Sequence, residues 1–301
     1  MALWIPITLA GAFLQNLRSV AQKHLKSAMG TTGATFVRFG FGLPVAILFL
    51  VLLRWRAEAP VPDLQPAFYG WVTLGGLAQI AGTFALIHVF SFRNFAVGTA
   101  WSRTEPAQAA LFGLLFLGDR VSAGGLAAIL ISVLGVMLIS VAHVQAGWRA
   151  TLTSVFQRNA LIGLGSGMMF GVSAVSYRAA STSVGGPDFL TQAAVTLVAT
   201  LCLQVLVMGA WMLWRERGEF ARIARAWKVS LFAGVCGASA SFCWFAAMTL
   251  QSAAMVKALG QVEMLFTFAA TVFFFREKIT WREALGCLLI TAGILVLLFF
   301  G

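Results

Sequence analysis

Two glutamates lie deep within apolar stretches of the chain, and a shift of 158 residues superimposes Glu105 on Glu263. An ionisable side chain near a bilayer midplane costs roughly 3 kcal/mol or more, so it is usually kept for function or for pairing. Carboxylates can accept hydrogen bonds from an ammonium group, and the nearby bases Arg103 and Lys257 can donate to a carboxylate. Charged residues at equivalent places in a duplicated sequence predict a central site between two related halves, which is typical of a transporter.

The first glutamate has an aromatic neighbour and a proline beside it. Trp101 and Glu105 lie four residues apart and share one face of a predicted helix, whereas Arg103 points nearly the other way. Arg103 is therefore not expected to neutralise Glu105 within the helix. Pro106 removes a backbone donor and clashes with the preceding turn, so we expect a kink that frees carbonyl groups near residue 102.

The second glutamate lies beside a polar helical face that carries Lys257 and Gln261. Two interpretations of Glu105 and Glu263 are open. Each could form a structural ion pair with a basic residue, or each could bind substrate or carry a proton.

A polar stripe runs along the first apolar stretch, where Gln15, Arg18, Gln22 and Lys26 recur at spacings of three to four. A stripe that faced lipid would be very costly, so it must face protein or water. A cavity wall and interhelical hydrogen bonding both account for it. Gln15 and Arg18 form the deeper pair.

Three further side chains are candidates for a role in the interior. Trp101 and Trp244 lie away from the ends of the apolar stretches, unlike the remaining tryptophans. A buried indole requires a partner for its N–H, so these two residues fit either a cavity wall or ordinary packing. His88 lies within the last two turns of the third stretch, where a structural role and proton transfer are both open.

Composition shows that the chain positioning these residues is a membrane protein. Of its 301 residues 60% are hydrophobic and only 10% are charged, with a mean hydropathy of +0.89, whereas a soluble domain carries about 25% charge. Apolar runs of about 20 residues can cross the hydrocarbon core, and these lack the alternation of barrel strands. The predicted fold class is therefore an all-α membrane protein with ten transmembrane helices. The spans are predicted at 3–22, 33–53, 68–91, 96–117, 122–143, 160–180, 188–214, 229–250, 254–275 and 281–300.

Several classes of function are disfavoured. The net charge of +11 is concentrated at span ends, which favours contacts with anionic lipid over nucleic-acid binding. The cysteines have no CxxC spacing and the histidines no metal-ligand spacing, so we expect no disulfide, metal or other cofactor. No Walker sequence supports direct use of ATP, and no catalytic pattern supports an intramembrane enzyme.

The sequence is duplicated. The same shift of 158 residues aligns 116–121 with 274–279 without a gap. Each half holds five spans, which predicts one domain at 1–145 and a second at 155–301. An odd number of spans makes the second half enter the membrane from the opposite side, so we predict two inverted five-helix repeats with a central cavity between them.

Two segments resemble the closing half of an EamA domain, namely TEPAQAALFGLLFLGDRVSAGGLAAILISVLGVMLIS at 104–140 and VEMLFTFAATVFFFREKITWREALGCLLITAGILVLL at 262–298. Each places an acid and a base in a tight turn before a Gly-rich helix, and the first has a proline in its opening helix. Asp119 departs from the usual Glu, and Met264 replaces the second proline. Tandem EamA units resemble the ten-helix branch of the drug/metabolite transporter superfamily, which includes YddG-type amino acid exporters.

The resemblance implies a secondary transporter that exports small polar metabolites, above all amino acids, by alternating access. An amino acid needs acceptors for its ammonium group, donors for its carboxylate and an apolar wall. The candidate substrate-binding residues are Gln15, Arg18, Trp101, Arg103, Glu105, Trp244, Lys257, Gln261 and Glu263, and the candidate coupling residues are Glu105, Glu263 and His88.

Alternatives of the same fold are a drug, lipid-carrier or nucleotide-sugar transporter, and a channel is a further alternative. Proton coupling and facilitated exchange are both open. The expected partners are a small-molecule substrate and membrane lipid, and a monomer is compatible with the sequence.

Basic residues predict the orientation in the cell inner (plasma) membrane. Thirteen lie near the odd connections and four near the even ones, so the positive-inside rule places the odd connections in the cytoplasm and both termini outside. The resemblance points the other way, since several relatives have cytoplasmic termini.

Overall fold

The computed structural model describes residues 2–57, 64–89, 92, 95–141, 156–185, 188–273 and 280–301. Every regular element in these ranges is a helix, which confirms the all-α class. The aligned segment 274–279 and the predicted domain boundaries at 145 and 155 lie outside the described residues.

The helices form two compact units, one of residues 1–77 and 176–250 and the other of residues 78–175 and 251–301. Each compact unit contains helices from both predicted sequence repeats. The two compact units therefore do not coincide with the two predicted repeats. The repeat boundaries stay a prediction.

The first unit contains α1 (Trp4–Leu25), α2 (Thr31–Gly40), α3 (Gly42–Ala57), α10 (Phe189–Arg215), α11 (Gly218–Arg225) and α12 (Trp227–Leu250). The second contains α5 (Phe95–Ser102), α6 (Glu105–Leu117), α7 (Ala123–Ser140), α13 (Ala253–Leu259), α14 (Val262–Phe273) and α15 (Trp281–Phe300). Two helices, α4 (Pro66–Val89) and α9 (Arg158–Ser183), contribute residues to both units.

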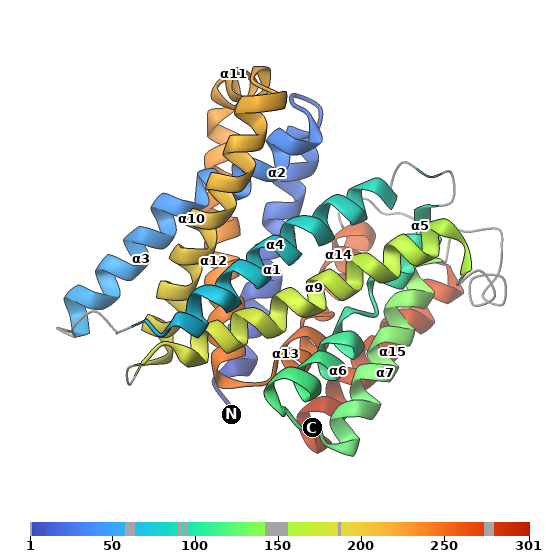
Figure 1. Ribbon diagram of the computed structural model, residues 1–301. Helices are drawn as coiled ribbons and strands as arrows, with labels where there is room; N and C mark the ends of the chain where they lie inside the picture. The colour runs from blue at the N-terminus through green and yellow to red at the C-terminus, as the bar shows by residue number, and fades with distance from the viewer. Residues whose placement is uncertain are drawn as a thin grey trace. The chain divides into compact units, whose positions relative to one another are not determined.

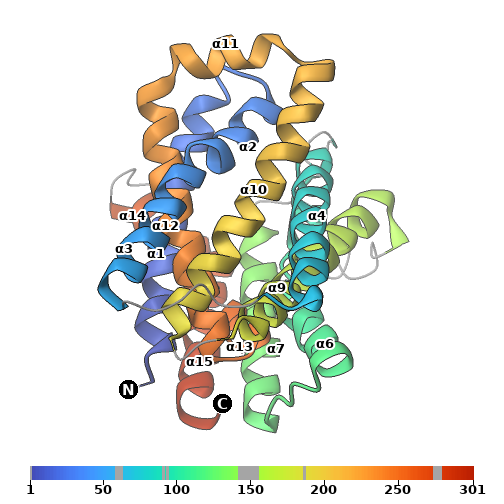
Figure 2. The same ribbon diagram turned by 60° about the vertical axis from the view of Figure 1, so that its left-hand side comes forward.

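In the first unit α1 packs along α12, and α11 crosses the adjacent ends of α10 and α12 (Figure 2). Glu219 of α11 is buried and accepts a hydrogen bond from the backbone N–H of Gly30 at 2.9 Å. Its other oxygen accepts from Arg222 Nη1 at 2.5 Å. These bonds fix the start of α2 against α11, because a buried carboxylate is stable only when it is paired and hydrogen-bonded.

In the second unit α7 and α15 lie side by side (Figure 1). Small residues permit this approach. A Cβ at Gly135 would lie 2.7 Å from the carbonyl oxygen of Gly286, and a Cβ at Gly293 would overlap Ser132 Oγ. Close contact through small residues is a common means of joining helices in membranes.

The Gly293→Ala variant tests this packing. The new Cβ would also lie 2.9 Å from the backbone nitrogen of Ser132, so α7 and α15 must move apart. We expect the free energy of unfolding to fall by about 1–3 kcal/mol, the usual cost of overpacking, and the thermal midpoint in detergent to fall with it. Gly165→Ala is the matched control, because a Cβ there has no atom of a described residue within 4 Å. Equal midpoints for the two variants would contradict the described packing.

Seven helical segments among the described residues are long and apolar enough to cross a membrane. The predicted count of ten is therefore not confirmed, and three predicted spans account for the difference. The polar stripe of α1 lowers its hydropathy, and the spans predicted at 96–117 and 254–275 are each divided into two short helices. These two divided spans carry most of the predicted site residues.

Candidate functional site

The span predicted at 96–117 is broken near its middle. α5 ends at Ser102 and α6 begins at Glu105, with Arg103 and Thr104 between them. Pro106 lies in the first turn of α6, where its missing N–H is harmless because the N–H groups of a first turn have no partner within the helix. The predicted disturbance at Pro106 is confirmed, and it is a break rather than a kink.

The span predicted at 254–275 is broken at the equivalent place. α13 ends at Leu259 and α14 begins at Val262, within one residue of the position to which the 158-residue shift carries the first break. No proline accompanies this second break, and Gly260, a poor helix former, lies in it instead. Discontinuous helices with free ends inside the membrane are a recurring feature of substrate and ion sites in transporters.

The charged residues suit the helix ends at which they lie. Glu105 and Glu263 stand in the first turns of α6 and α14, where the positive end of the helix dipole stabilises a carboxylate. Lys257 stands in the last turn of α13, where the negative end stabilises an ammonium group. Each such placement contributes about 0.5 kcal/mol, which offsets part of the cost of keeping charge in an apolar span.

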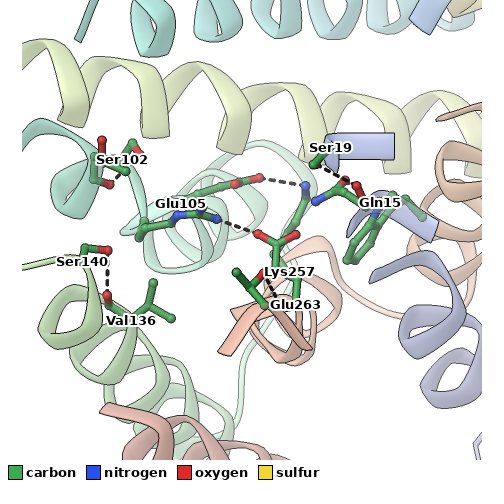
Figure 3. A network of polar contacts seen from close by, with 12 residues as sticks. Gln15, Ser19, Ser102, Glu105, Val136, Ser140, Lys257 and Glu263 are labelled. Atoms are coloured by element: carbon green, nitrogen blue, oxygen red, sulfur yellow. Dashed lines mark hydrogen bonds and ion pairs between the residues drawn. The ribbon is translucent and has the colours of Figure 1, made fainter. Parts of the chain in front are cut away.

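The two glutamates pair with bases of the other broken span. Lys257 Nζ lies 2.9 Å from Glu105 Oε1, and Arg103 Nη1 donates a hydrogen bond of 2.6 Å to Glu263 Oε1. Figure 3 shows Lys257 reaching Glu105, with Glu263 beside them. Both glutamates are thus ion-paired, and Arg103 pairs with Glu263 rather than with Glu105. A role of either glutamate in substrate binding or coupling stays a prediction.

These pairs are only partly buried. The exposed fractions of the side chains are 15% for Glu263, 20% for Glu105, 24% for Lys257 and 30% for Arg103. A fully buried pair would be closed to any ligand, whereas these four groups keep surface at which a small polar molecule could compete for them.

Apart from Glu105 Oε1, which Lys257 reaches as an ion pair, two polar atoms at the breaks have no hydrogen-bond partner among the described residues. The indole nitrogen Nε1 of Trp101, in the last turn of α5, is a buried donor. The amide oxygen Oε1 of Gln261, between α13 and α14, is a buried acceptor. Buried polar atoms are nearly always bonded, so an unsatisfied donor and an unsatisfied acceptor at two related breaks are what a site for a polar ligand would show.

The candidates of the first unit have different surroundings. Trp244 is buried, and its Nε1 donates a hydrogen bond of 3.1 Å to Oε1 of Gln15. This bond ties α12 to α1, as the interhelical interpretation of the stripe predicted. A substrate-binding role for Gln15, Arg18 and Trp244 stays a prediction. On the same helix, Ser19 Oγ donates a hydrogen bond of 2.7 Å to the carbonyl oxygen of Gln15 (Figure 3). Arg18 packs its aliphatic part near Gly237.

His88 lies in the last turn of α4, as predicted, and its side chain is exposed. Its ring packs edge to face on Phe92, with 5.2 Å between the ring centroids. A role for His88 in coupling stays a prediction.

Sequence reasoning missed Arg38. This residue stands in the last turn of α2, within a membrane-span candidate that runs from Thr31 to Trp55. The rule that singled out the two glutamates, a lone charge inside an apolar span, also selects Arg38.

The comparison with protein families decides the class of the protein. The model of the EamA-like transporter family matches residues 2–141 and 157–299. This chain belongs to the EamA-like transporter family. Together with its apolar helices, that membership makes it a multi-pass membrane transporter.

Other comparisons relate this EamA-like chain to known proteins. It is 25% identical over 221 residues to a probable sugar phosphate/phosphate translocator of Arabidopsis thaliana, in an alignment that covers 71% of this chain. The chain spans about half the length of that curated relative, 46%. A crystal structure of another protein matches with a TM-score of 0.68 at 16% identity, covering 97% of this chain and 95% of the other. That likeness concerns the fold alone.

Proposed function

We propose that this protein is a secondary transporter that exports a small polar metabolite by alternating access, with amino acids as the first candidates. The observation that carries the proposal is the crossed arrangement of Glu105 with Lys257 and of Arg103 with Glu263 at two related helix breaks. Family membership supports transport. The partial exposure of the four charges supports their participation in it.

The chemistry of the site suits a zwitterion. In the absence of substrate each cation faces a carboxylate, so the site is close to neutral and tolerable in an apolar span. An amino acid brings one ammonium group and one carboxylate, so it can replace these contacts without changing the net charge. Gln261 Oε1 offers an acceptor for the ammonium group, and Trp101 Nε1 offers a donor for the carboxylate.

A phosphorylated metabolite is the second candidate. The observation that favours it is the similarity to a probable sugar phosphate/phosphate translocator. A phosphate monoester carries nearly two negative charges at neutral pH, so it would need more cationic contacts than an amino acid does.

Location and orientation are part of the proposal. We place the protein in the cell inner membrane with both termini outside, following the distribution of basic residues at the predicted connections. A C-terminal fusion to a reporter active only outside the cytoplasm tests this orientation. An inactive reporter on a well-expressed protein would reverse it.

Counterflow in proteoliposomes tests the function. Purified protein is reconstituted into vesicles preloaded with unlabelled metabolite, and uptake of the radiolabelled compound is followed for panels of amino acids, sugar phosphates, drugs and nucleotide sugars. Trans-acceleration by at least one amino acid is the expected result. Acceleration by sugar phosphates alone would select the second candidate. Uptake that does not saturate and shows no trans-acceleration would contradict alternating access and favour a channel.

The Trp101→Phe variant tests the role of the unsatisfied indole. Phenylalanine keeps an apolar ring but removes the N–H, so we expect half-saturation for a carboxylate-bearing substrate to rise about fivefold, the value of a neutral hydrogen bond. Trp244→Phe is the matched control, since it removes an N–H that already has Gln15 as its acceptor. An equal change in both variants would point to general damage rather than to substrate contact.

A further inference from the structure

Arg38 is isolated in an otherwise uncharged segment. It is the one charged residue between Thr31 and Leu53 in the sequence, and it lies one turn before the junction of α2 and α3. A cation in such a span costs roughly 3 kcal/mol or more and is usually kept for a function.

A second arginine meets Arg38 at Gly237 of α12. A Cβ at Gly237 would lie 3.3 Å from Cδ of Arg18 and 3.3 Å from Cγ of Arg38. Because both atoms are this close to one point, they cannot be further apart than twice that distance. Glycine thus leaves the room in which the aliphatic parts of both arginine side chains pack against α12.

The described residues leave Arg38 without a carboxylate. Its Nε is buried and has no hydrogen-bond partner among them, and its guanidinium group stacks over the ring of Phe39 with 5.2 Å to the centroid. An aromatic face stabilises a cation, but it does not satisfy an N–H group. One donor of the guanidinium group is therefore buried without an acceptor among the described residues.

The described carboxylates of the first unit have other partners. Asp188 accepts from backbone N–H groups at the start of α10. Glu216 accepts from Thr32 Oγ1 at 3.1 Å, and Glu219 accepts from Gly30 and Arg222. All three lie at or near helix ends, so they do not account for a cation inside the span.

We propose that Arg38 binds a soluble oxyanion, a carboxylate or a phosphate group, within the first unit. The planar guanidinium fork matches both groups and favours two parallel hydrogen bonds. This assignment goes beyond the proposed function, because it adds an anion site in the first unit to the substrate contacts proposed at the helix breaks of the second.

Anion binding to the purified protein in detergent tests the assignment without requiring transport. Inorganic phosphate and acetate are titrated while the thermal midpoint is followed, with chloride at equal ionic strength as the reference, since a ligand that binds the folded state raises the midpoint. We expect at least one of the two anions to raise the midpoint of the unsubstituted protein. The concentration for half of this effect should rise about tenfold or more in Arg38→Gln, the scale of a lost charged hydrogen bond, and less in Arg38→Lys. Arg225→Gln, which changes an exposed arginine of the same unit, should match the unsubstituted protein.

Two results would overturn the assignment. One is an absence of any response to phosphate or acetate in the unsubstituted protein. The same conclusion follows if the Arg38 variants that fold respond to the anions as the unsubstituted protein does. The other is a phospholipid at the site. Mass spectrometry would then detect an anionic lipid that co-purifies with the unsubstituted protein but not with Arg38→Gln, and the response to phosphate would be the same in both proteins. If either result is found while counterflow is intact, only the anion site at Arg38 is refuted. If no metabolite shows counterflow, the proposed function is refuted.

Discussion

Replacing Glu105 with glutamine is expected to lower the counterflow rate roughly ten- to a hundredfold, equivalent to about 1.4–2.8 kcal/mol in the barrier. The substitution keeps the size of the side chain and removes its charge. It takes away an acceptor for the substrate ammonium group, and it leaves Lys257, now 2.9 Å from Glu105, without its carboxylate inside an apolar span.

The measurement is the initial rate of counterflow per reconstituted protein, with expression and thermal midpoint recorded in parallel. Glu216→Gln is the matched control. Glu216 accepts a hydrogen bond from Thr32 Oγ1, which a glutamine oxygen can also accept. A Glu105→Gln protein that transports at the rate of this control would refute a direct role for Glu105.

Reversing the charge of Arg103 should destabilise the protein strongly. Arg103→Glu would place two carboxylates where a 2.6 Å ion pair now joins Arg103 to Glu263. Breaking a fully buried pair costs about 3–5 kcal/mol. Because these side chains are 30% and 15% exposed, solvent screening reduces our estimate to roughly 2–3 kcal/mol.

Adding Glu263→Arg to Arg103→Glu restores an ion pair in which the acid and the base have exchanged positions. We expect the thermal midpoint to recover most of the loss, because the two residues are coupled through one contact. The cycle of single and double variants in detergent measures that coupling. Simple additivity of the two single effects would show that the pair does not form.

Hydropathy and sequence periodicity predicted the helical class and placed the charged residues inside apolar spans, because both properties depend on local composition. They could not predict the partners of those charges. Glu105 pairs with a base 152 residues away, and such a pairing is set by packing. The break before Glu105 has a local signal in Pro106, whereas the break before Glu263 has only Gly260, and the span predicted there was continuous.

The sequence did not predict the two compact units either. A duplication of sequence records common descent of two halves, but helices pack where their surfaces fit, and here α1 packs on α12 across the predicted repeats. Arg38 is a different case. Its signal is local, because it is a lone charge within the predicted span 33–53. The rule that selected the two glutamates, a charge inside an apolar span, also selects Arg38.

The proposed function requires direct contact between the substrate and the charges at the two helix breaks. The most direct test is the substrate affinity of the charge-exchanged protein, Arg103→Glu with Glu263→Arg, measured as half-saturation of counterflow on the best substrate of the panel. If these side chains contact the substrate, half-saturation should rise at least about tenfold although the thermal midpoint has recovered. If the pair is only a structural link, the exchanged protein will bind substrate as tightly as the original, and the proposed site is wrong.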